Sequence, residues 1–462
     1  MSVDTVSLTG WGRTAPTTAL RFRPRSHEEA AATVRGCGPR GSIARGLGRA
    51  HGDAAQNAGG SVLDMTALNR IRAFDAGTGV VVCEAGVSLH QLLEVLLPLG
   101  WFPPVTPGSR YVTVGGAIGA DVHGDNHRAA GSFSRHVTEF ELLTADGEIR
   151  TVRPGTPLFD ATAGGMGLTG VILSATLRLH PVATSLMSVD TERAADLDDL
   201  MTRLASGGHH HRYESAWVDL TARGRATGRG VLTRGEHAPL DALPAHARRA
   251  PLSFRPAQLP AAHSLVPDLV DLVDLVDLVP GRLLGRTSAA VLAELRYRRA
   301  PRSRTGELQR ISAFFHPLDA VPHWNRIHGR GGFVHYEFAV GHGQEETLHR
   351  IVRQISQRRC PSFLAALRRC GESGPGRLSF PVPGWALSLD LPAALPGLAR
   401  FLDGLDEEVA AAGGRVSLTN DSRLRPDMLA AMYPRLGEFR ALRAESDPDG
   451  AFRSDLSRRL SL

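Results

Sequence analysis

Two glycine-rich stretches near the N-terminus contain residues that could bind a diphosphate. The first is IARGLGRAHGDAAQ at residues 43–56, and the second is TVGGAIGADVHGDNH at residues 113–127, which follows Pro107-Gly108-Ser109-Arg110. Glycine-dense loops expose successive backbone N–H groups, which can cradle phosphate oxygens without any lysine. A single loop of this kind is as often structural as ligand-binding. Two such loops that flank a βα unit favour a bound dinucleotide.

The chain contains no lysine, so all 53 of its basic residues are arginine, and the net charge is +6. This excludes Schiff-base chemistry and the phosphate-binding lysine of Walker A motifs. It also excludes lysine as a general base, and arginine cannot replace it because the guanidinium stays protonated. No basic cluster is interleaved with aromatic residues, so we expect no nucleic-acid partner.

Three other patterns have simpler explanations. Gly165, Gly167 and Gly170 match G-x-G-x-x-G, but a strand is expected after them, which argues against a dinucleotide fingerprint of the Rossmann type. The run His209–His211 follows two glycines and is interpreted as a solvated loop, so no metal site is expected. The four cysteines are scattered without a CxxC pair, and we interpret them as reduced structural thiols.

The elements that must position the two loops are those of an α+β domain. Helices with Ser-x-x-Glu or Ser-x-x-Gln capping boxes are predicted at 26–36 and after Ser88. Apolar or alternating residues predict strands at 79–84 and 171–179, and an Asp-Gly turn predicts a hairpin over 138–152. Glycine-rich connections between these elements are expected to face the ligand.

The middle of the chain, about 184–405, is expected to form an antiparallel sheet with helices on one face. Short aromatic strands are predicted at 213–220, 311–316 and 333–340. The segment 266–279 repeats Asp-Leu-Val, a period that gives a helix no fixed apolar stripe. It is interpreted as a surface loop expansion, with a mobile lid or a lipid-facing helix as the alternative.

Long ordered segments resemble the vanillyl-alcohol oxidase superfamily of FAD-binding proteins. They include both glycine-rich loops, VCEAGVSLHQLLEVLLPLG, GGMGLTGVILSATLRLHP, HPLDAVPHWNR, LSFPVPGW and NDSR. The matches run from LTGWGRTAP near the N-terminus to FRSDLSRRL near the C-terminus, so the resemblance covers nearly the whole chain. It implies an α+β fold in which residues 1–183 and 413–462 form a two-part FAD-binding domain around an inserted antiparallel-sheet substrate domain, 184–412.

The resemblance also implies a reaction. Within the superfamily, the chain resembles members that oxidise the C2 hydroxyl of a lipid-phosphoryl ribose to a 2-keto sugar by hydride transfer to flavin N5. In those members an NAD(P)H-dependent reductase partner completes conversion to arabinose, a cell-wall sugar. Two alternatives stay open: oxidation of a different alcohol in a biosynthetic pathway, and a flavin-binding partner without catalytic activity.

The resemblance implies FAD contacts at individual residues of this chain. Some superfamily members attach FAD to a histidine in the first loop, but the equivalent position here is Arg49, so noncovalent FAD is expected. The implied FAD contacts are Arg45, Gly46, Leu47, Gly48, Arg49, Gly52, Asp53, Pro107, Gly108, Ser109, Thr113, Gly115, Gly116, Ala117, His123, Gly124, Gly170, Val171 and Tyr433.

The substrate side departs from the resemblance, whereas the FAD loops are largely intact. Asn420 and Asp125 replace lysines, and the remaining replacements are His51 and Phe315 for tyrosine, His335 and Glu337 for glutamine, Ser388 for cysteine and Ala386 for asparagine. Losing two cations weakens the case for an anionic sugar and suggests a paralogue with a related substrate.

Several side chains are candidates for the chemistry at this site. His123 is the first choice for the proton acceptor, because histidine titrates nearest neutral pH. The catalytic candidates are His123, Glu337, His335, Asp390 and Asn420. The substrate-binding candidates are Trp217, Phe315, Arg326 and Ser388.

No apolar run of 18 residues and no secretory signal is visible in the sequence. We therefore expect a cytoplasmic protein without a transmembrane segment. Peripheral contact with a membrane stays open, because the implied substrate is a lipid-linked sugar.

Overall fold

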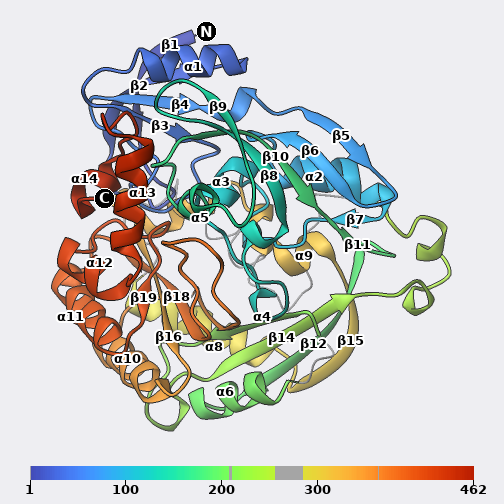
Figure 1. The fold of residues 1–462 in the computed structure, drawn as a ribbon. Coiled ribbons are helices and arrows are strands. Elements are labelled where there is room, and N and C mark those ends of the chain that lie inside the picture. The colour runs from blue at the N-terminus through green and yellow to red at the C-terminus, as the bar shows by residue number, and fades with distance from the viewer. Residues whose placement is uncertain (1, 208–210, 255–284, 363) are drawn as a thin grey trace.

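The computed structural model describes residues 2–207, 211–254, 285–362 and 364–462. Three sheets dominate the fold (Figure 1): two smaller sheets are built from the N-terminal part of the chain, and one large sheet lies below them in the view. The Asp-Leu-Val segment at 266–279 lies outside the described residues, as do His209 and His210.

The first sheet delivers the first glycine-rich loop. Its strand order is β1-β2-β4-β3, with β1 Ser2–Leu8, β2 Thr17–Arg23, β4 Ser61–Asp64 and β3 Ser42–Arg45. Helix α1 (His27–Arg35) begins where the Ser26 hydroxyl accepts a hydrogen bond from the Glu29 amide, as predicted. Because β3 ends at Arg45, the chain enters the loop at once.

The second sheet carries the other loop. Its order is β5-β6-β10-β8-β9, with β5 Ile71–Asp75, β6 Val80–Glu84, β10 Val171–Arg178, β8 Val137–Leu143 and β9 Ile149–Val152. Helix α2 (Leu89–Leu96) has the predicted Ser88–Gln91 capping box, and α3 (Val114–Gly119) starts at the Thr113 cap. The predicted hairpin is β8–β9, and β10 follows Gly170, which confirms that no Rossmann helix follows the G-x-G-x-x-G pattern.

The C-terminal residues return to the first loop. Helices α13 (Leu436–Ser446) and α14 (Asp455–Leu460) lie beside the first sheet, and α12 (Pro426–Met432) packs against α14 (Figure 1). A parallel bridge joins Ser42 to Phe452, and Arg459 forms an ion pair of 2.8 Å with Asp53 of the loop. These contacts agree with a two-part FAD domain, although the exact division at residues 183/184 and 412/413 stays a proposal.

The third sheet is antiparallel throughout, with the order β15-β12-β14-β13-β17-β18-β16-β19. Its strands are β12 Leu186–Ala194, β13 Tyr213–Val218, β14 Gly230–His237, β15 Ser303–Arg310, β16 Phe333–Gly341, β17 Ala365–Cys370, β18 Gly384–Pro392 and β19 Arg415–Val416. Helices α6 (Leu197–Ser206), α10 (Glu345–Arg358) and α11 (Leu398–Ala411) cover one face (Figure 1).

Strand alternation gives this sheet two different faces. Tyr336 and Phe338 of β16 pack into the apolar core with the covering helices. His335 and Glu337, which alternate with them, therefore point to the opposite face. Ser388 of β18 is the cross-strand partner of Glu337 and shares that face. The sheet thus separates an apolar core from a polar cavity.

Two expectations about this region need correction. Residues 311–316 were predicted as a strand, but Ile311–Phe315 is a helix, α9. A short apolar run does not distinguish strand from helix by period, and here Ile311 and Phe315, four residues apart, pack into one apolar cluster. Helices also lie on both faces of the sheet, because Ala293 of α8 (Arg286–Arg299) packs against Trp217 on the cavity side.

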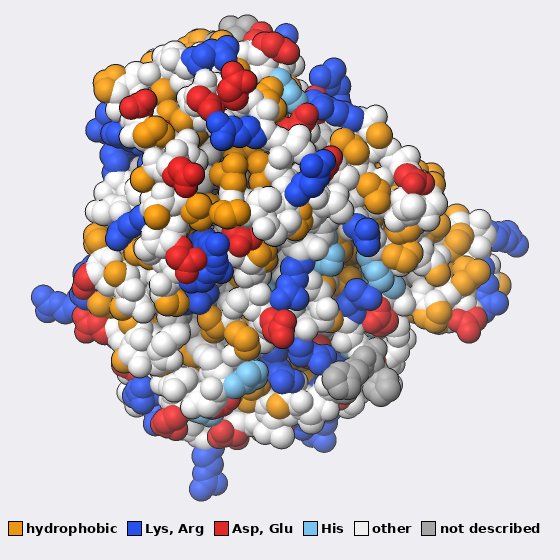
Figure 2. Space-filling model, viewed as in Figure 1, with side chains coloured by type: hydrophobic (Ala, Val, Ile, Leu, Met, Phe, Trp, Pro, Cys, Tyr) orange, Lys and Arg blue, Asp and Glu red, His pale blue; other side chains and the backbone are white. Residues whose placement is uncertain are grey.

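The remaining sequence expectations concern metals, thiols and membranes. The described residues hold no group of three or more His, Cys, Asp or Glu side chains placed for a metal ion. All four cysteines are free, and His211 pairs with Asp190 at 3.3 Å. Within the described ranges, no helix combines the length and apolar character needed to cross a bilayer. Arginine and acidic side chains are interspersed over the face shown in Figure 2.

Candidate active site

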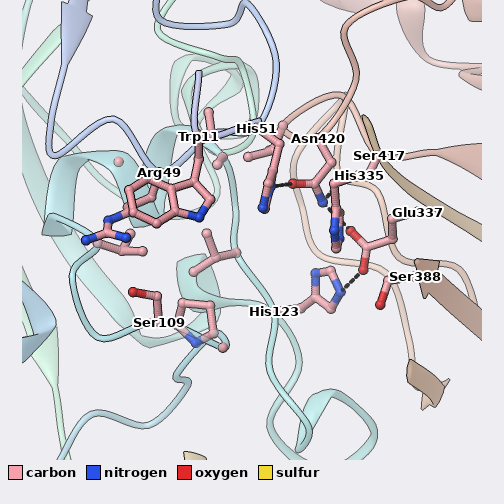
Figure 3. A pocket seen from close by; sticks show the side chains of 18 of the residues that line it. Trp11, Arg49, His51, Ser109, His123, His335, Glu337, Ser388, Ser417 and Asn420 are labelled. Carbon is pink, nitrogen blue, oxygen red and sulfur yellow. Dashed lines mark hydrogen bonds and ion pairs between the residues drawn. The ribbon is translucent and has the colours of Figure 1, made fainter. Parts of the chain in front are cut away.

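A cavity of about 610 Å³ lies between the two glycine-rich loops and the polar face of the large sheet. Trp11, Arg49 and Ser109 border one side in Figure 3, and Glu337 and Asn420 border the other. The cavity therefore joins the loops expected to bind a cofactor to the strands expected to bind a substrate.

Close packing fixes the backbone of the first loop. A Cβ at Gly46 would lie 2.2 Å from the Thr113 hydroxyl oxygen, so the two loops touch here. Gly48 has a φ of +66°, which an L side chain rarely adopts. A side chain at Gly46 would push the two loops apart, and one at Gly48 would collide with the Arg45 side chain of the same loop. These glycines are needed by the protein itself, whatever ligand it binds.

The second loop is fixed from the substrate side. Asp319 accepts hydrogen bonds from the Ser109 hydroxyl and the Arg110 amide, both at 2.8 Å. Gly108 lies between these anchored residues and Pro107, and no atom lies within 4 Å of a Cβ built on it. The protein offers no packing reason for a glycine at 108, whereas the close approach of a ligand would require one.

Most of the carried-over FAD residues line the cavity. They are Arg45, Gly46, Leu47, Gly48, Arg49, Gly52, Pro107, Gly108, Ser109, Thr113, Gly115, Gly116, His123 and Gly170. Those outside the lining are Asp53, Ala117, Gly124, Val171 and Tyr433. Asp53 is paired with Arg459, Ala117 and Val171 are core residues, and the Tyr433 hydroxyl donates to the Val416 carbonyl at 2.7 Å.

Arg49 stands where the resemblance implies a flavin-bonding histidine in some superfamily members. Its guanidinium carbon lies 3.8 Å from the centroid of the Trp11 ring, a stacked cation–π arrangement. Its Nε atom is buried and has no hydrogen-bond partner among the described residues. A buried orphan donor at the wall of the cavity fits a ligand acceptor, so the loops fit FAD both in shape and in unsatisfied polar groups.

A valine at position 108 is expected to raise the dissociation constant of FAD about tenfold, because its side chain would occupy space needed by the ligand. The thermal midpoint of the apoprotein should change little, since no protein atom is contacted. Flavin fluorescence titration and thermal unfolding of the apoprotein measure the two quantities. As a matched control, Gly46→Val should destabilise the apoprotein itself, and unchanged FAD affinity in Gly108→Val would contradict the expectation.

Four side chains from separate segments form a hydrogen-bonded chain across the cavity (Figure 3). His123 Nε2 lies 3.2 Å from Glu337 Oε1, and Asn420 Nδ2 donates to Glu337 Oε2 at 2.6 Å. His51 Nδ1 lies 2.6 Å from Asn420 Oδ1. The carboxylate and the amide oxygen can only accept, so His123 donates through Nε2 and His51 through Nδ1. This leaves His123 Nδ1 and His51 Nε2 as acceptors.

Charge in the site is set by burial and by close partners. Burial would raise the pKa of Glu337, but His123, His335 and Arg368 outweigh it and hold that pKa well below its usual range. Burial lowers the pKa of His51 to about 3, and neighbouring His335 adds to the effect. Glu337 is therefore anionic and His51 neutral at physiological pH.

A second ion pair lies beside this chain. His335 Nδ1 is 2.5 Å from Asp390 Oδ1, and the His335 ring stacks on His51 with centroids 4.3 Å apart. Burial would lower the pKa of His335, but the charge and hydrogen bond of Asp390 outweigh it and raise that pKa. Burial would likewise raise the pKa of Asp390, which His335 lowers. The pair is best described as imidazolium and carboxylate.

Asp390→Asn is expected to lower the free energy of unfolding by about 1–3 kcal/mol at pH 6, because it removes a hydrogen bond between charged partners. The folded-state pKa of His335 is raised. The stabilisation is therefore complete below about pH 6.5, the unfolded value, and disappears as pH rises through the folded pKa. Urea unfolding of both proteins at pH 6 and pH 9 measures the difference, and an equal loss at both would contradict this account. In a His335→Gln background the same substitution should lose its pH dependence.

All five catalytic candidates line the cavity, as do Trp217, Phe315 and Ser388 of the substrate candidates. Arg326 is not among the lining residues. Sequence analysis gave no role to His51, Ser417, Arg368 or Arg296, which also line the cavity. Arg368 Nε donates to Asp125 Oδ1 at 2.6 Å. The sequence feature that could have identified Arg368 is the acidic residue at position 125, because a carboxylate that lines a cavity predicts a cation close by.

The fold and the site define an FAD-binding oxidoreductase of the vanillyl-alcohol oxidase superfamily. A family profile described as an FAD binding domain matches residues 18–153. The decaprenylphosphoryl-β-D-ribose oxidase of Mycolicibacterium smegmatis is 42% identical over 99% of this chain and 98% of its own length. The chain therefore belongs to the family of FAD-dependent oxidoreductases that includes this oxidase.

Two further relatives have a higher and a lower sequence identity to this chain than the ribose oxidase. An uncharacterized protein in the mprA 5′ region of Streptomyces coelicolor is 55% identical over 81% of this chain and 100% of its own length. An L-gulono-1,4-lactone dehydrogenase of Mycobacterium tuberculosis is 28% identical over 41% of this chain and 44% of its own length. The chain thus has a relative of higher identity than the ribose oxidase, which agrees with a paralogue.

Proposed function

We propose that this enzyme oxidises the C2 hydroxyl of a phosphoryl ribose-type pentose, free or lipid-linked, to a 2-keto sugar. Noncovalently bound FAD supplies the hydride acceptor, flavin N5. The observation that carries the proposal is the hydrogen-bonded chain at the cavity wall that joins His123 of the second glycine-rich loop to Glu337 and Asn420. The relative over nearly the whole chain acts, by its name, on decaprenylphosphoryl-β-D-ribose.

In this proposal His123 takes the hydroxyl proton. Its Nε2–H is held by Glu337, so the tautomer leaves Nδ1 to accept a proton from the substrate. The anionic Glu337 then stabilises the imidazolium that forms, as carboxylates do in other base–orienter pairs. Asn420 fixes the second oxygen of Glu337 by a 2.6 Å hydrogen bond and acts as a positioning residue.

His123 and Glu337 handle the proton, whereas the stacked histidines His51 and His335 have other roles. His335 is committed to Asp390 and stays charged, so it adds positive potential beside the cavity and is a poor proton acceptor. Neutral His51 presents Nε2 to the cavity as a hydrogen-bond acceptor. Ser388, beside Glu337 in the sheet, offers a hydroxyl for the sugar.

The proposal is tested by mixing the FAD-loaded enzyme anaerobically with farnesylphosphoryl-ribose and with ribose. The phosphoryl pentose should bleach the yellow flavin and yield a ketone two mass units lighter than the substrate. Bleaching by a different alcohol alone would favour the alternative of another biosynthetic oxidase, as the altered side chains at 51, 335, 337, 388 and 420 suggest. A 2-keto product would need a carbonyl-reducing partner that uses NAD(P)H to reach the epimeric pentose.

A further inference from the structure

A row of cross-strand neighbours leads away from Glu337 along the floor of the cavity. Glu337 pairs with Ser388, Ser388 with Ala366, and Ala366 with Trp217, on strands β16, β18, β17 and β13. Cross-strand partners share one face, and adjacent strands lie about 4.8 Å apart, so the row spans about 14 Å. Ala366, in the middle, has the smallest side chain of the four and leaves the floor open.

Helix α8 brings a cation over the far end of this row. The guanidinium carbon of Arg296 lies 4.6 Å from the centroid of the Trp217 ring, and both residues line the cavity. The Arg296 side chain forms no ion pair or hydrogen bond with any described residue, whereas Arg298 of the same helix is paired with Glu294. Burial alone lowers the pKa of Arg296 to about 9, with no acidic neighbour to offset it.

Polar but uncharged side chains line the cavity on the same face of the sheet as Trp217. Thr233 pairs across the sheet with Thr191 and with Ser215, and these three residues line the cavity together with Gln309. Among the described lining residues, the acidic ones are Asp121, Asp125, Asp319, Glu337 and Asp390, and none of them forms an ion pair with Arg296. A guanidinium that lies on an indole face without a paired carboxylate matches a phosphate-type anion.

We propose that Arg296 and Trp217 form an anion subsite that binds the phosphoryl group of the substrate, with the pentose lying between it and the His123–Glu337 pair. This inference rests on the proposed function, whose substrate class it makes specific. It also explains how a chain with Asn420 and Asp125 in place of two lysines still recognises an anionic sugar. The positive charge for the substrate comes from α8 at the far end of the cavity.

Binding measured by calorimetry on the FAD-loaded protein tests the subsite without any turnover. The probes are farnesyl phosphate, ribose 5-phosphate and, as the neutral control, farnesol. Arg296→Gln should weaken the binding of at least one phosphate about tenfold or more, as expected for losing a charge-assisted hydrogen bond, and should leave farnesol unchanged. Arg296→Lys should retain part of the affinity. Which phosphate the wild-type protein prefers tells a lipid phosphate from a free sugar phosphate.

Arg298→Gln is the matched control, because Arg298 lies on the same helix and is mainly exposed to solvent. The subsite is overturned if Arg296→Gln binds both phosphates as the wild-type protein does, or if it weakens farnesol equally. With a reducing substrate, the variant should raise the concentration needed for half-maximal flavin reduction and leave the limiting rate unchanged. Because the calorimetric readout involves no redox step, a flavin that no pentose reduces would reject the proposed function without deciding the subsite.

Discussion

His123→Gln is expected to slow flavin reduction by a saturating phosphoryl pentose about 100- to 10,000-fold, the usual contribution of a positioned general base. Glutamine can still donate a hydrogen bond to Glu337, which now receives one from His123 at 3.2 Å. It cannot accept the hydroxyl proton. Anaerobic stopped-flow absorbance of the bound flavin measures the rate directly.

The pH dependence of the same rate separates proton transfer from packing. In the wild-type enzyme the rate should fall at low pH, because a general base acts only in its unprotonated form, and His123→Gln should lose this limb. His127→Gln is the control, because His127 is buried in the same loop, contacts Ser132 and the Gly371 amide, and does not line the cavity. A His123→Gln enzyme that keeps the wild-type rate and pH limb would assign the proton to another group.

Asn420→Lys is expected to lower the flavin-reduction rate about tenfold, which corresponds to about 1.4 kcal/mol less stabilisation of protonated His123 in the transition state. The Asn420 amide lies 2.6 Å from Glu337 and accepts from His51. A lysine would form an ion pair with Glu337, which weakens the support that Glu337 gives to His123. It would also leave His51 without its acceptor, because an ammonium only donates.

The double variant Asn420→Lys/Glu337→Gln tests this coupling. Removing the carboxylate removes the new ion pair. The double variant should therefore reduce its flavin faster than expected if the two single substitutions raised the activation free energy additively. Stopped-flow rates of the four enzymes complete the cycle. A gain of activity on a phosphoryl ribose in Asn420→Lys alone would instead identify this chain as a decayed copy of the ribose oxidase, in which residue 420 acts independently of Glu337.

The parts of the fold that were predictable from sequence are those fixed by neighbouring residues. The Ser88–Gln91 box starts α2 at the expected residue because a capping box acts within four residues. The Asp-Gly turn between β8 and β9 is equally local. The helix at Ile311–Phe315 was mistaken for a strand because its identity depends on packing against Phe102 and Tyr213, which are distant in sequence.

The candidate site was predictable as a set of residues but not as a network. Each departure from the resemblance was visible in the sequence, yet nothing local shows that residues 51, 123, 337 and 420 join by hydrogen bonds. The sequence showed that two lysines are replaced at the substrate side, but it did not show which arginines lie there instead. Arg368 and Arg296 restore positive charge from β17 and α8, and only the tertiary arrangement brings them to the cavity.

Oxidation at the C2 hydroxyl requires that the C2–H bond breaks when the flavin is reduced. The decisive measurement compares anaerobic flavin reduction by a phosphoryl ribose carrying deuterium at C2 with reduction by the same sugar carrying deuterium at C3. We predict that deuterium at C2 slows the reduction and is absent from the 2-keto product, while deuterium at C3 does not slow the reduction. A flavin that stays oxidised, or one reduced equally fast by both sugars, would contradict oxidation at the C2 hydroxyl.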